Sequence, residues 1–248
     1  MNFLKNVFAR IWALWGLISF VITFLIIFIP SMISYLIPDP RGQAYFIYVS
    51  RLWMKTWLFL IGCRIKIMGR ENFIKGKTYV IVFNHNALLD VPLSAPFVPG
   101  PNKTIAKSSY VKVPLFGWFY KKGAVLVNRK DEKSRFKSFD EMKRVLAGGI
   151  HMSIYPEGTR NRTNQSLKSF YDGAFKLAHA ANKEIIPCII SGTKKAMPVN
   201  KTFYLLPGNL KMQFLSPVSS ENISIPDLKQ KVFEIMKKKY DESLQIVK

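Results

Sequence analysis

The chain has 248 residues, which allows one substantial hydrophobic core or a domain with an appended segment. Lys and Arg number 37 against 15 Asp and Glu, so the formal net charge is +22 and nucleic acid, anionic lipid and acidic proteins are all admissible partners. The two cysteines, Cys63 and Cys188, fit neither a disulfide framework nor a Cys-x-x-Cys metal site, which excludes a disulfide-rich secreted domain.

The first predicted element is a membrane-seeking helix. No charged residue occurs from position 11 to position 38, and a helix of that length reaches about 42 Å against a hydrocarbon core of about 30 Å. The apolar region is longer than that of a secretory signal peptide and has no convincing cleavage site, so we expect the segment to be retained. Pro30 is expected to kink or break the helix, and the sequence IPDPRG at 37–42 is expected to end it.

A second apolar stretch, residues 44–62, carries Arg51 and Lys55 one helical turn apart. Spanning the bilayer would bury two cations at about 2.5 to 3.5 kcal/mol each, a cost that a helix in the interface avoids. Positive residues flank the first helix on both sides and give no clear orientation. We therefore expect residues 1–61 to form a two-helix anchor that dips into one leaflet at the cytoplasmic face of the cell membrane; the alternative is a single transmembrane span.

Membrane lipids also account for the net charge, because anionic headgroups attract the same basic surface as nucleic acid does. The sequence contains no recognisable nucleic-acid-binding module, so we expect no nucleic-acid partner.

Residues 62–248 are predicted to form one α/β domain. Short β-rich runs alternate with amphipathic stretches, a pattern typical of a mostly parallel central sheet flanked by helices. The predicted strands are 64–69, 78–84, 103–107, 124–128, 151–156, 185–192 and 210–215, and the predicted helices are 131–149, 172–183 and a final helix from 226 onward. The apolar face of that final helix consists of Leu228, Val232, Ile235, Met236 and Tyr240.

The stretch FNHNALLD at 83–90 holds the first candidate site. The apolar run before it ends where Asn84 and His85 begin, which places both at the carboxyl end of a strand, where open α/β sheets bind ligands. A histidine accepts a proton near neutral pH, and a carboxylate such as Asp90 fixes its tautomer. Five residues is not a same-face helical spacing, so the pair meets only if the chain turns between them. The hypothesis is a catalytic base with its orienting carboxylate; the alternative is a helix-capping Asn or Asp beside an unrelated histidine.

Three further segments place basic and small residues after predicted strands. The segment YPEGTRNR at 155–162 offers arginine forks, which bind phosphate bidentately, and a glycine, which permits close backbone approach. The alternative for each of these cations, considered alone, is an ordinary solvated charge on the protein surface. The candidate substrate-binding residues are Lys107, Arg129, Glu157, Gly158, Thr159 and Arg160.

In this order and spacing, four segments resemble the motifs of the glycerolipid acyltransferase family, that of the 1-acylglycerol-3-phosphate acyltransferases. The segments are NHNALLD (84–90), similar to the NH-x4-D motif, GAVLVNR (123–129), similar to the second motif, YPEGTR (155–160), similar to the Phe-Pro-Glu-Gly motif, and IIPCIISGT (185–193), similar to the proline-containing fourth motif. The resemblance covers about residues 62 to 217. The chain departs from the pattern at Asn86 and Ala87, where members often have Gln-Ser, and at Tyr155, which replaces phenylalanine.

The resemblance implies transfer of an acyl chain from a thioester of acyl carrier protein or coenzyme A to the free hydroxyl of lysophosphatidic acid, giving phosphatidic acid. It implies that His85 is the base, that Asp90 orients it, and that Arg129, Arg160 and Lys107 hold the acceptor phosphate. No metal, cofactor or covalent intermediate is implied, and the G-x-S-x-G elbow of a serine hydrolase is missing from the sequence. Two alternatives stay open: another acceptor, such as glycerol-3-phosphate or another lysolipid, and a non-catalytic, basic membrane-binding protein.

Overall fold

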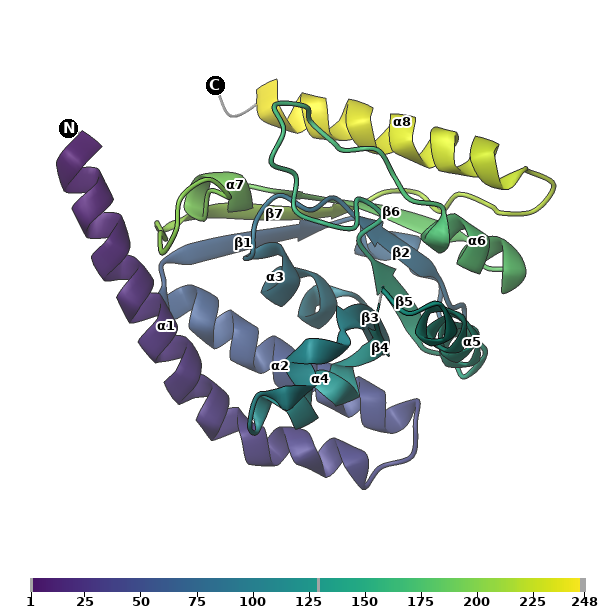
Figure 1. The fold of residues 1–248 in the computed structure, drawn as a ribbon, viewed down its shortest axis with the longest axis horizontal. Helices are drawn as coiled ribbons and strands as arrows, with labels where there is room; N and C mark the ends of the chain where they lie inside the picture. The colour runs from purple at the N-terminus through teal and green to yellow at the C-terminus, as the bar shows by residue number, and fades with distance from the viewer. Residues whose placement is uncertain (1, 129, 246–248) are drawn as a thin grey trace.

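A seven-stranded sheet forms the centre of the protein, and helices cover both of its faces (Figure 1). The computed structural model describes residues 2–128 and 130–245. The strand order is β1-β7-β6-β2-β5-β3-β4, and each neighbouring pair is parallel except β6 and β7. This arrangement confirms the predicted α/β class with a mostly parallel sheet.

All seven predicted strands are present, with ends that differ by a few residues from the predicted ones. They are β1 (Cys63–Met68), β2 (Val80–Phe83), β3 (Asn102–Lys107), β4 (Ala124–Val127), β5 (His151–Ile154), β6 (Ile185–Ser191) and β7 (Gly208–Phe214). The α-helices are α1 (Asn2–Met32), α2 (Arg41–Leu60), α3 (Asp90–Phe97), α4 (Phe116–Gly123), α5 (Glu132–Ala147), α6 (Gly173–Ala180), α7 (Thr193–Ala196) and α8 (Ile225–Gln245). Short 3-10 turns are η1 (Ile33–Tyr35), η2 (Arg70–Asn72) and η3 (Ser108–Lys112).

The central strand β2 shows how the two hydrophobic layers form. Successive side chains of a strand point to opposite faces, and all four residues of β2 are buried. Ile81 and Phe83 join the cluster that contains residues of α2 and α3, whereas Val80 and Val82 join the cluster formed with α5, α6 and α8. A strand that is apolar at every position is therefore buried on both faces, as parallel sheets require.

Helix α1 packs against α2 through tryptophan side chains and leaves its other face exposed. Four indole N–H groups donate between the two helices or to the residue after them: Trp12 to the Ile61 carbonyl, Trp15 to the Leu60 carbonyl, Trp57 to the Gly16 carbonyl and Trp53 to Thr23 Oγ1. On the outer face, Leu4, Ile11, Ile26 and Ile29 are each more than 60% exposed. By length and composition α1 could cross a membrane. So much exposed apolar surface supports association with a membrane.

The end of α1 differs slightly from the prediction. The helix continues through Pro30 and ends at Met32, and η1 follows before the chain turns into α2. No break therefore occurs at Pro30, and the helix ends five residues before the sequence at 37–42 that was expected to end it.

Helix α2 lies between α1 and the sheet, and much of it is buried. Trp53, Met54 and Leu58 belong to the same hydrophobic cluster as Ile81 of β2. Arg51, one of the two cations that argued against a membrane span, donates from Nε to the Pro96 carbonyl at 2.7 Å and from Nη2 to the Val98 carbonyl at 2.9 Å. Its charge therefore stabilises the carboxyl end of α3. The division between residues 61 and 62 remains a prediction, although this cluster is continuous across it.

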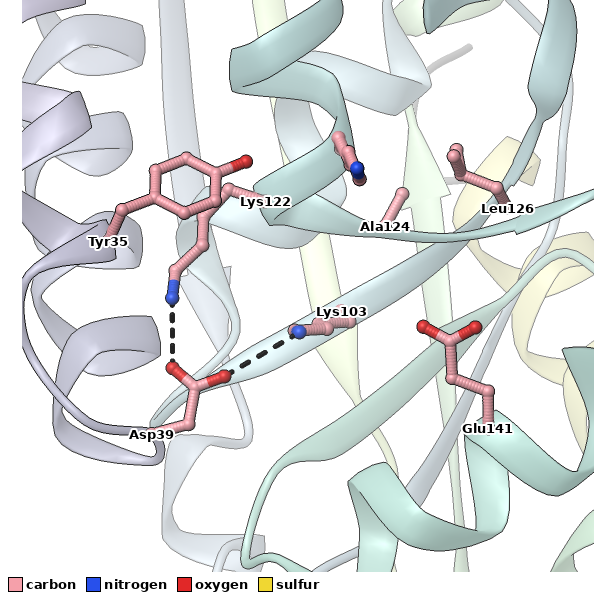
Figure 2. Close-up of a pocket in the computed structure, with 8 residues that line it drawn as sticks. Tyr35, Asp39, Lys103, Lys122, Ala124, Leu126 and Glu141 are labelled. Atoms are coloured by element: carbon pink, nitrogen blue, oxygen red, sulfur yellow. Dashed lines mark hydrogen bonds and ion pairs between the residues drawn. The ribbon is translucent and has the colours of Figure 1, made fainter.

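A charged cluster attaches the turn before α2 to β3 and α4 (Figure 2). Asp39 pairs with Lys122 Nζ at 2.9 Å and with Lys103 Nζ at 3.6 Å. The Lys122 ammonium also lies 5.3 Å from the ring centre of Tyr35, whose hydroxyl donates to the Trp118 carbonyl at 2.9 Å. These side chains surround a cavity of about 360 Å³ near the amino end of β3. The cavity therefore lies at the end of the sheet opposite to the carboxyl ends of β2 and β5.

Candidate active site

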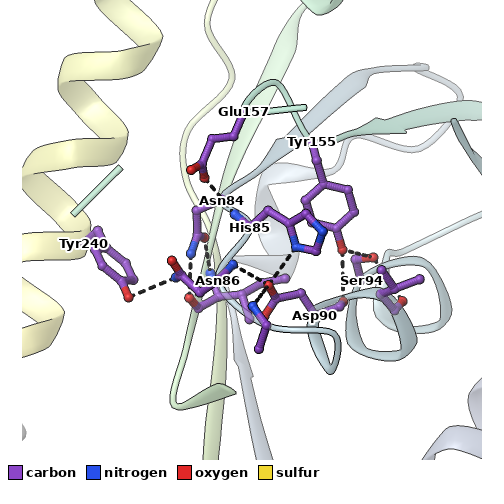
Figure 3. A network of polar contacts seen from close by, with 11 residues as sticks. Asn84, His85, Asn86, Asp90, Ser94, Tyr155, Glu157 and Tyr240 are labelled. Atoms are coloured by element: carbon purple, nitrogen blue, oxygen red, sulfur yellow. Dashed lines mark hydrogen bonds and ion pairs between the residues drawn. The ribbon is translucent and has the colours of Figure 1, made fainter. Parts of the chain in front are cut away.

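His85 and Asp90 meet at the carboxyl end of β2 (Figure 3). The chain turns between β2 and α3, and α3 begins at Asp90. His85 Nδ1 lies 3.0 Å from Asp90 Oδ2, and the two side chains are 14% and 0% exposed. The turn that the five-residue spacing required is therefore present, and the predicted contact between the two side chains is formed.

The Asp90 carboxylate holds the turn as well as the imidazole. Oδ2 accepts from the Asn86 backbone N–H at 2.6 Å and from the Ala87 N–H at 2.7 Å. These donors precede α3, whose capping residue Leu89 makes no side-chain cap bond, so Asp90 does not act as a helix cap. Two backbone N–H groups already donate to this oxygen, and a carboxylate oxygen can only accept, so its contact with His85 Nδ1 places a proton on the imidazole nitrogen. A proton on His85 Nδ1 then points at Asp90, and this tautomer leaves the Nε2 lone pair to accept a proton.

Tyr155 packs on the histidine ring. The two ring centres lie 4.4 Å apart, and the Tyr155 hydroxyl bonds the Asp90 carbonyl oxygen at 3.0 Å and Ser94 Oγ at 2.7 Å. Burial, together with the nearby Asp90 charge, raises the pKa of Tyr155 well above its usual range. The hydroxyl therefore stays protonated and ties the end of β5 to the first turn of α3. A phenylalanine here would keep the ring packing but lose this link.

Glu157 holds the backbone of His85 and that of its own loop. Its Oε1 accepts from the His85 N–H at 2.7 Å, and its Oε2 accepts from the Lys168 N–H at 3.1 Å. The Asn161 N–H in turn donates to the His85 carbonyl at 2.6 Å. Glu157 is fully buried, and burial raises its pKa although the two N–H donors oppose that shift. Its carboxylate is thus committed to positioning the loop that carries the third motif.

Glu157→Gln is expected to lower the free energy of unfolding by about 1 to 3 kcal/mol, since a glutamine offers one carbonyl oxygen to two buried backbone donors. Its NH₂ group would face either the His85 or the Lys168 N–H. Thermal denaturation of the purified protein in detergent measures the loss. Glu141→Gln, the same substitution at an exposed position of α5, is the matched control. Equal stability of the two variants would contradict the bracing role.

The remaining residues of the third motif lie on the loop after β5. Gly158 has a φ of +71°, a backbone conformation that favours glycine. Thr159 Oγ1 accepts from Lys168 Nζ at 2.9 Å, and Arg160 is half-buried. The structure thus places these three residues directly beside the segment that holds the His85 backbone. Their contact with substrate remains a prediction.

Two more of the predicted substrate-binding residues, Lys107 and Arg129, lie in the sequence at or just after the ends of other predicted strands. Lys107 is exposed at the carboxyl end of β3, at the same end of the sheet as His85. Arg129 lies outside the described residues. Among residues 2–128 and 130–245, no three His, Cys, Asp or Glu side chains group in a way that could hold a metal ion.

The sequence did not predict the contacts that two asparagines make at the site. Asn84 exchanges two side-chain hydrogen bonds with the backbone of Ile190, at 2.8 and 2.7 Å, and so joins the ends of β2 and β6. Asn86 Nδ2 donates to the Tyr240 hydroxyl of α8 at 2.9 Å (Figure 3). The sequence did contain one sign of the second contact: Tyr240 lies on the apolar face of the final helix, and a buried phenol needs a polar partner.

Comparison with known proteins gives a consistent picture. The family model described as Acyltransferase matches residues 64–191. A 1-acyl-sn-glycerol-3-phosphate acyltransferase of Chlamydomonas reinhardtii is 35% identical over 59% of this chain and 44% of its own length. The Saccharomyces cerevisiae protein of the same name is 29% identical over 80% of this chain and 65% of its own length. The chain therefore spans less than two thirds of either relative.

A solved structure shares the fold over almost the whole chain. The crystal structure of the 1-acyl-sn-glycerophosphate (LPA) acyltransferase PlsC from Thermotoga maritima superposes with a TM-score of 0.79 and covers 98% of this chain and 97% of its own. At 22% sequence identity, this likeness concerns the fold.

Proposed function

Because the chain belongs to the acyltransferase family, we propose that it transfers a fatty acyl chain from an acyl thioester to the free hydroxyl of lysophosphatidic acid and so forms phosphatidic acid. The observation that carries this proposal is the contact between His85 and the buried Asp90 carboxylate, with 3.0 Å between Nδ1 and Oδ2. The names of the curated relatives support lysophosphatidic acid as the acceptor. Formation of this lipid is a step of phospholipid biosynthesis.

The reaction follows from the tautomer that Asp90 selects. His85 Nε2 removes the proton of the acceptor hydroxyl, and Asp90 stabilises the imidazolium that results. The hydroxyl oxygen attacks the thioester carbonyl carbon and forms a C–O bond. The C–S bond then breaks, and the leaving thiolate takes the proton back from His85. The products are an ester and a free thiol, so no metal, cofactor or covalent acyl-enzyme is needed.

The basic residues at the same end of the sheet supply the acceptor phosphate site. Arg160 lies on the loop that braces His85, and Lys107 ends β3 two strands away from β2. Arg129 follows β4 and is included from the sequence. Guanidinium forks bind phosphate through two parallel hydrogen bonds, which suits a terminal phosphate monoester.

Arg160→Ala is expected to raise the KM for lysophosphatidic acid about tenfold or more, because a charge-assisted hydrogen bond to phosphate contributes about 1.5 to 3 kcal/mol. The KM for the acyl donor should stay the same. Steady-state kinetics with each substrate varied in turn measures both constants. Arg135→Ala on the exposed surface of α5 is the control. An unchanged acceptor KM would remove Arg160 from the phosphate site.

The donor is acyl carrier protein or coenzyme A carrying the acyl chain, and both carry it as a thioester, so the same chemistry serves either. The membrane supplies the acceptor and takes up the product. The exposed apolar face of α1, with Lys5 and Arg10 near its start and Arg41 at the start of α2, supports an anchor in one leaflet, and we place that leaflet at the cytoplasmic face. An active site held at that surface reaches both lipids without extracting them.

The test is acyl transfer by the detergent-purified protein. A labelled acyl thioester is offered with lysophosphatidic acid, with glycerol-3-phosphate or with a neutral lysolipid. Transfer to lysophosphatidic acid is the expected result. Transfer only to another acceptor would replace the proposed substrate, and no transfer to any acceptor by folded protein would favour the non-catalytic, membrane-binding alternative.

A further inference from the structure

The last turns of α8 contact both loops that hold His85. Tyr240 bonds Asn86 of the turn between β2 and α3, which lies 154 residues away in the sequence. The next residue, Asp241, accepts a hydrogen bond from Ser166 in the loop that follows Glu157. Two consecutive residues of one helix therefore join the two loops from outside the site.

Helix α8 presents the Tyr240 hydroxyl from a fixed position. Leu228, Val232 and Met236 of the same helix are fully buried against the sheet, and Tyr240 itself is 4% exposed. Burial, together with the charges of Asp90 and Glu157, raises the pKa of Tyr240 to about 12. The hydroxyl is therefore neutral at any pH used to assay acyl transfer, and it can accept or donate a hydrogen bond.

Asn86 links Tyr240 to Asp90. Its side chain bonds Tyr240 at 2.9 Å, while its own backbone N–H donates to Asp90 Oδ2 at 2.6 Å. Asn86 is 1% exposed, so water does not readily replace a lost partner of its amide. If the Asn86 side-chain amide were flipped so that Oδ1 faced Tyr240, the Tyr240 hydroxyl would donate to that oxygen and the hydrogen bond would remain.

We propose that Tyr240 is a positioning residue for acyl transfer: through Asn86 it holds the backbone N–H groups on Asp90 and thereby fixes the orientation of the His85 ring. In its kinetic consequences this inference rests on the proposed function. The final helix thus completes the active site, although the four sequence motifs lie in residues 84–193.

Tyr240→Phe tests the proposal because it removes the hydroxyl and keeps the ring in the core. We expect kcat to fall about tenfold, as for one buried hydrogen bond, with both KM values within about twofold of the unmodified protein. Asn86→Ala should lower kcat as well. The double variant should be no slower than the slower single variant, since the two residues act in one chain of contacts.

Tyr79→Phe is the matched control. Tyr79 is fully buried, and its hydroxyl accepts one hydrogen bond, from the Ile74 N–H, at the other end of β2. It should lower the melting temperature much as Tyr240→Phe does and leave kcat unchanged. Equal kcat in the two variants, or multiplying effects of Tyr240→Phe and Asn86→Ala, would overturn the proposal and leave the proposed function intact.

A spectroscopic readout separates this inference from the reaction itself. The chain has three histidines, so the ¹⁵N imidazole signals of histidine-labelled protein can be assigned by substitution. In the unmodified protein we expect His85 to be the tautomer protonated at Nδ1, and in Tyr240→Phe a mixture of tautomers. A His85 signal unaltered by Tyr240→Phe would overturn the proposal even if the protein transferred acyl chains to none of the acceptors.

Discussion

Replacing His85 with alanine is expected to lower kcat at least about 100-fold, because a positioned general base contributes about 10² to 10⁴ to a rate. The fold should survive, since the backbone N–H and carbonyl of His85 keep their bonds to Glu157 and Asn161. Binding to lipid vesicles should also be unchanged, because α1 supplies the exposed apolar face. The measurement is initial-rate acyl transfer at saturating thioester and lysophosphatidic acid.

His179→Ala is the matched control for that experiment. His179 is an exposed histidine on α6, so its removal should leave the rate unaltered. If His85→Ala kept more than about a tenth of the activity while remaining folded, His85 would not be the base. Loss of activity together with loss of folding would be resolved by His85→Gln, which keeps a polar side chain in the turn.

The sheet and the contact between His85 and Asp90 were predictable from the sequence because both rest on local patterns. Strand β2 is a short apolar run bounded by polar residues, and the site follows it directly. Parallel strands bring their carboxyl ends to one edge, so the loops after β2 and β5 are neighbours once the sheet order is known. The sequence does not contain that order, and the two polar motifs alone left helix capping as an alternative for Asp90.

The environment of Arg51 shows why the anchor was harder to predict. An arginine within an apolar stretch is costly in lipid, which favoured a helix lying in the interface. In the fold the same side chain satisfies two carbonyl groups at the end of α3. A helix that packs against a sheet and one that lies on a membrane have the same composition, and only the tertiary contacts distinguish them.

Glu157 and Tyr240 show which contacts of the active site could not be predicted from the sequence. A carboxylate next to a glycine and an arginine favoured a role in substrate binding, but both of its oxygens accept from backbone N–H groups. Tyr240 was placed correctly on the apolar face of the last helix, yet its partner Asn86 lies 154 residues away. Hydrogen bonds from side chains to backbone, and contacts between residues far apart in sequence, depend on how separate helices and strands are aligned in the fold. Hydrophobic periodicity does not encode that alignment.

Asp90→Asn is expected to lower kcat by about 10² to 10⁴, because the substitution removes the charge that stabilises the His85 imidazolium and leaves the shape nearly unchanged. If the amide oxygen takes the place of Oδ2, it still accepts from the Asn86 and Ala87 N–H groups. The amide nitrogen then occupies the position of Oδ1, which is buried and has no hydrogen-bond partner among the described residues. If the amide takes the other orientation, its NH₂ group meets the two backbone N–H donors of Asn86 and Ala87, and the turn is forced open.

Combining Asp90→Asn with His85→Ala decides whether Asp90 acts through the histidine. If it does, the double variant should have the kcat of His85→Ala alone, because a residue that orients a base has no effect once the base is absent. Asp172→Asn, which breaks only a surface pair with Lys229, serves as the control and should leave kcat unchanged. A double variant slower than His85→Ala by the full effect of Asp90→Asn would mean that the carboxylate acts on the substrate directly or maintains the loop by itself. The second explanation has a structural basis, because Asp90 Oδ2 also accepts from two backbone N–H groups of that loop.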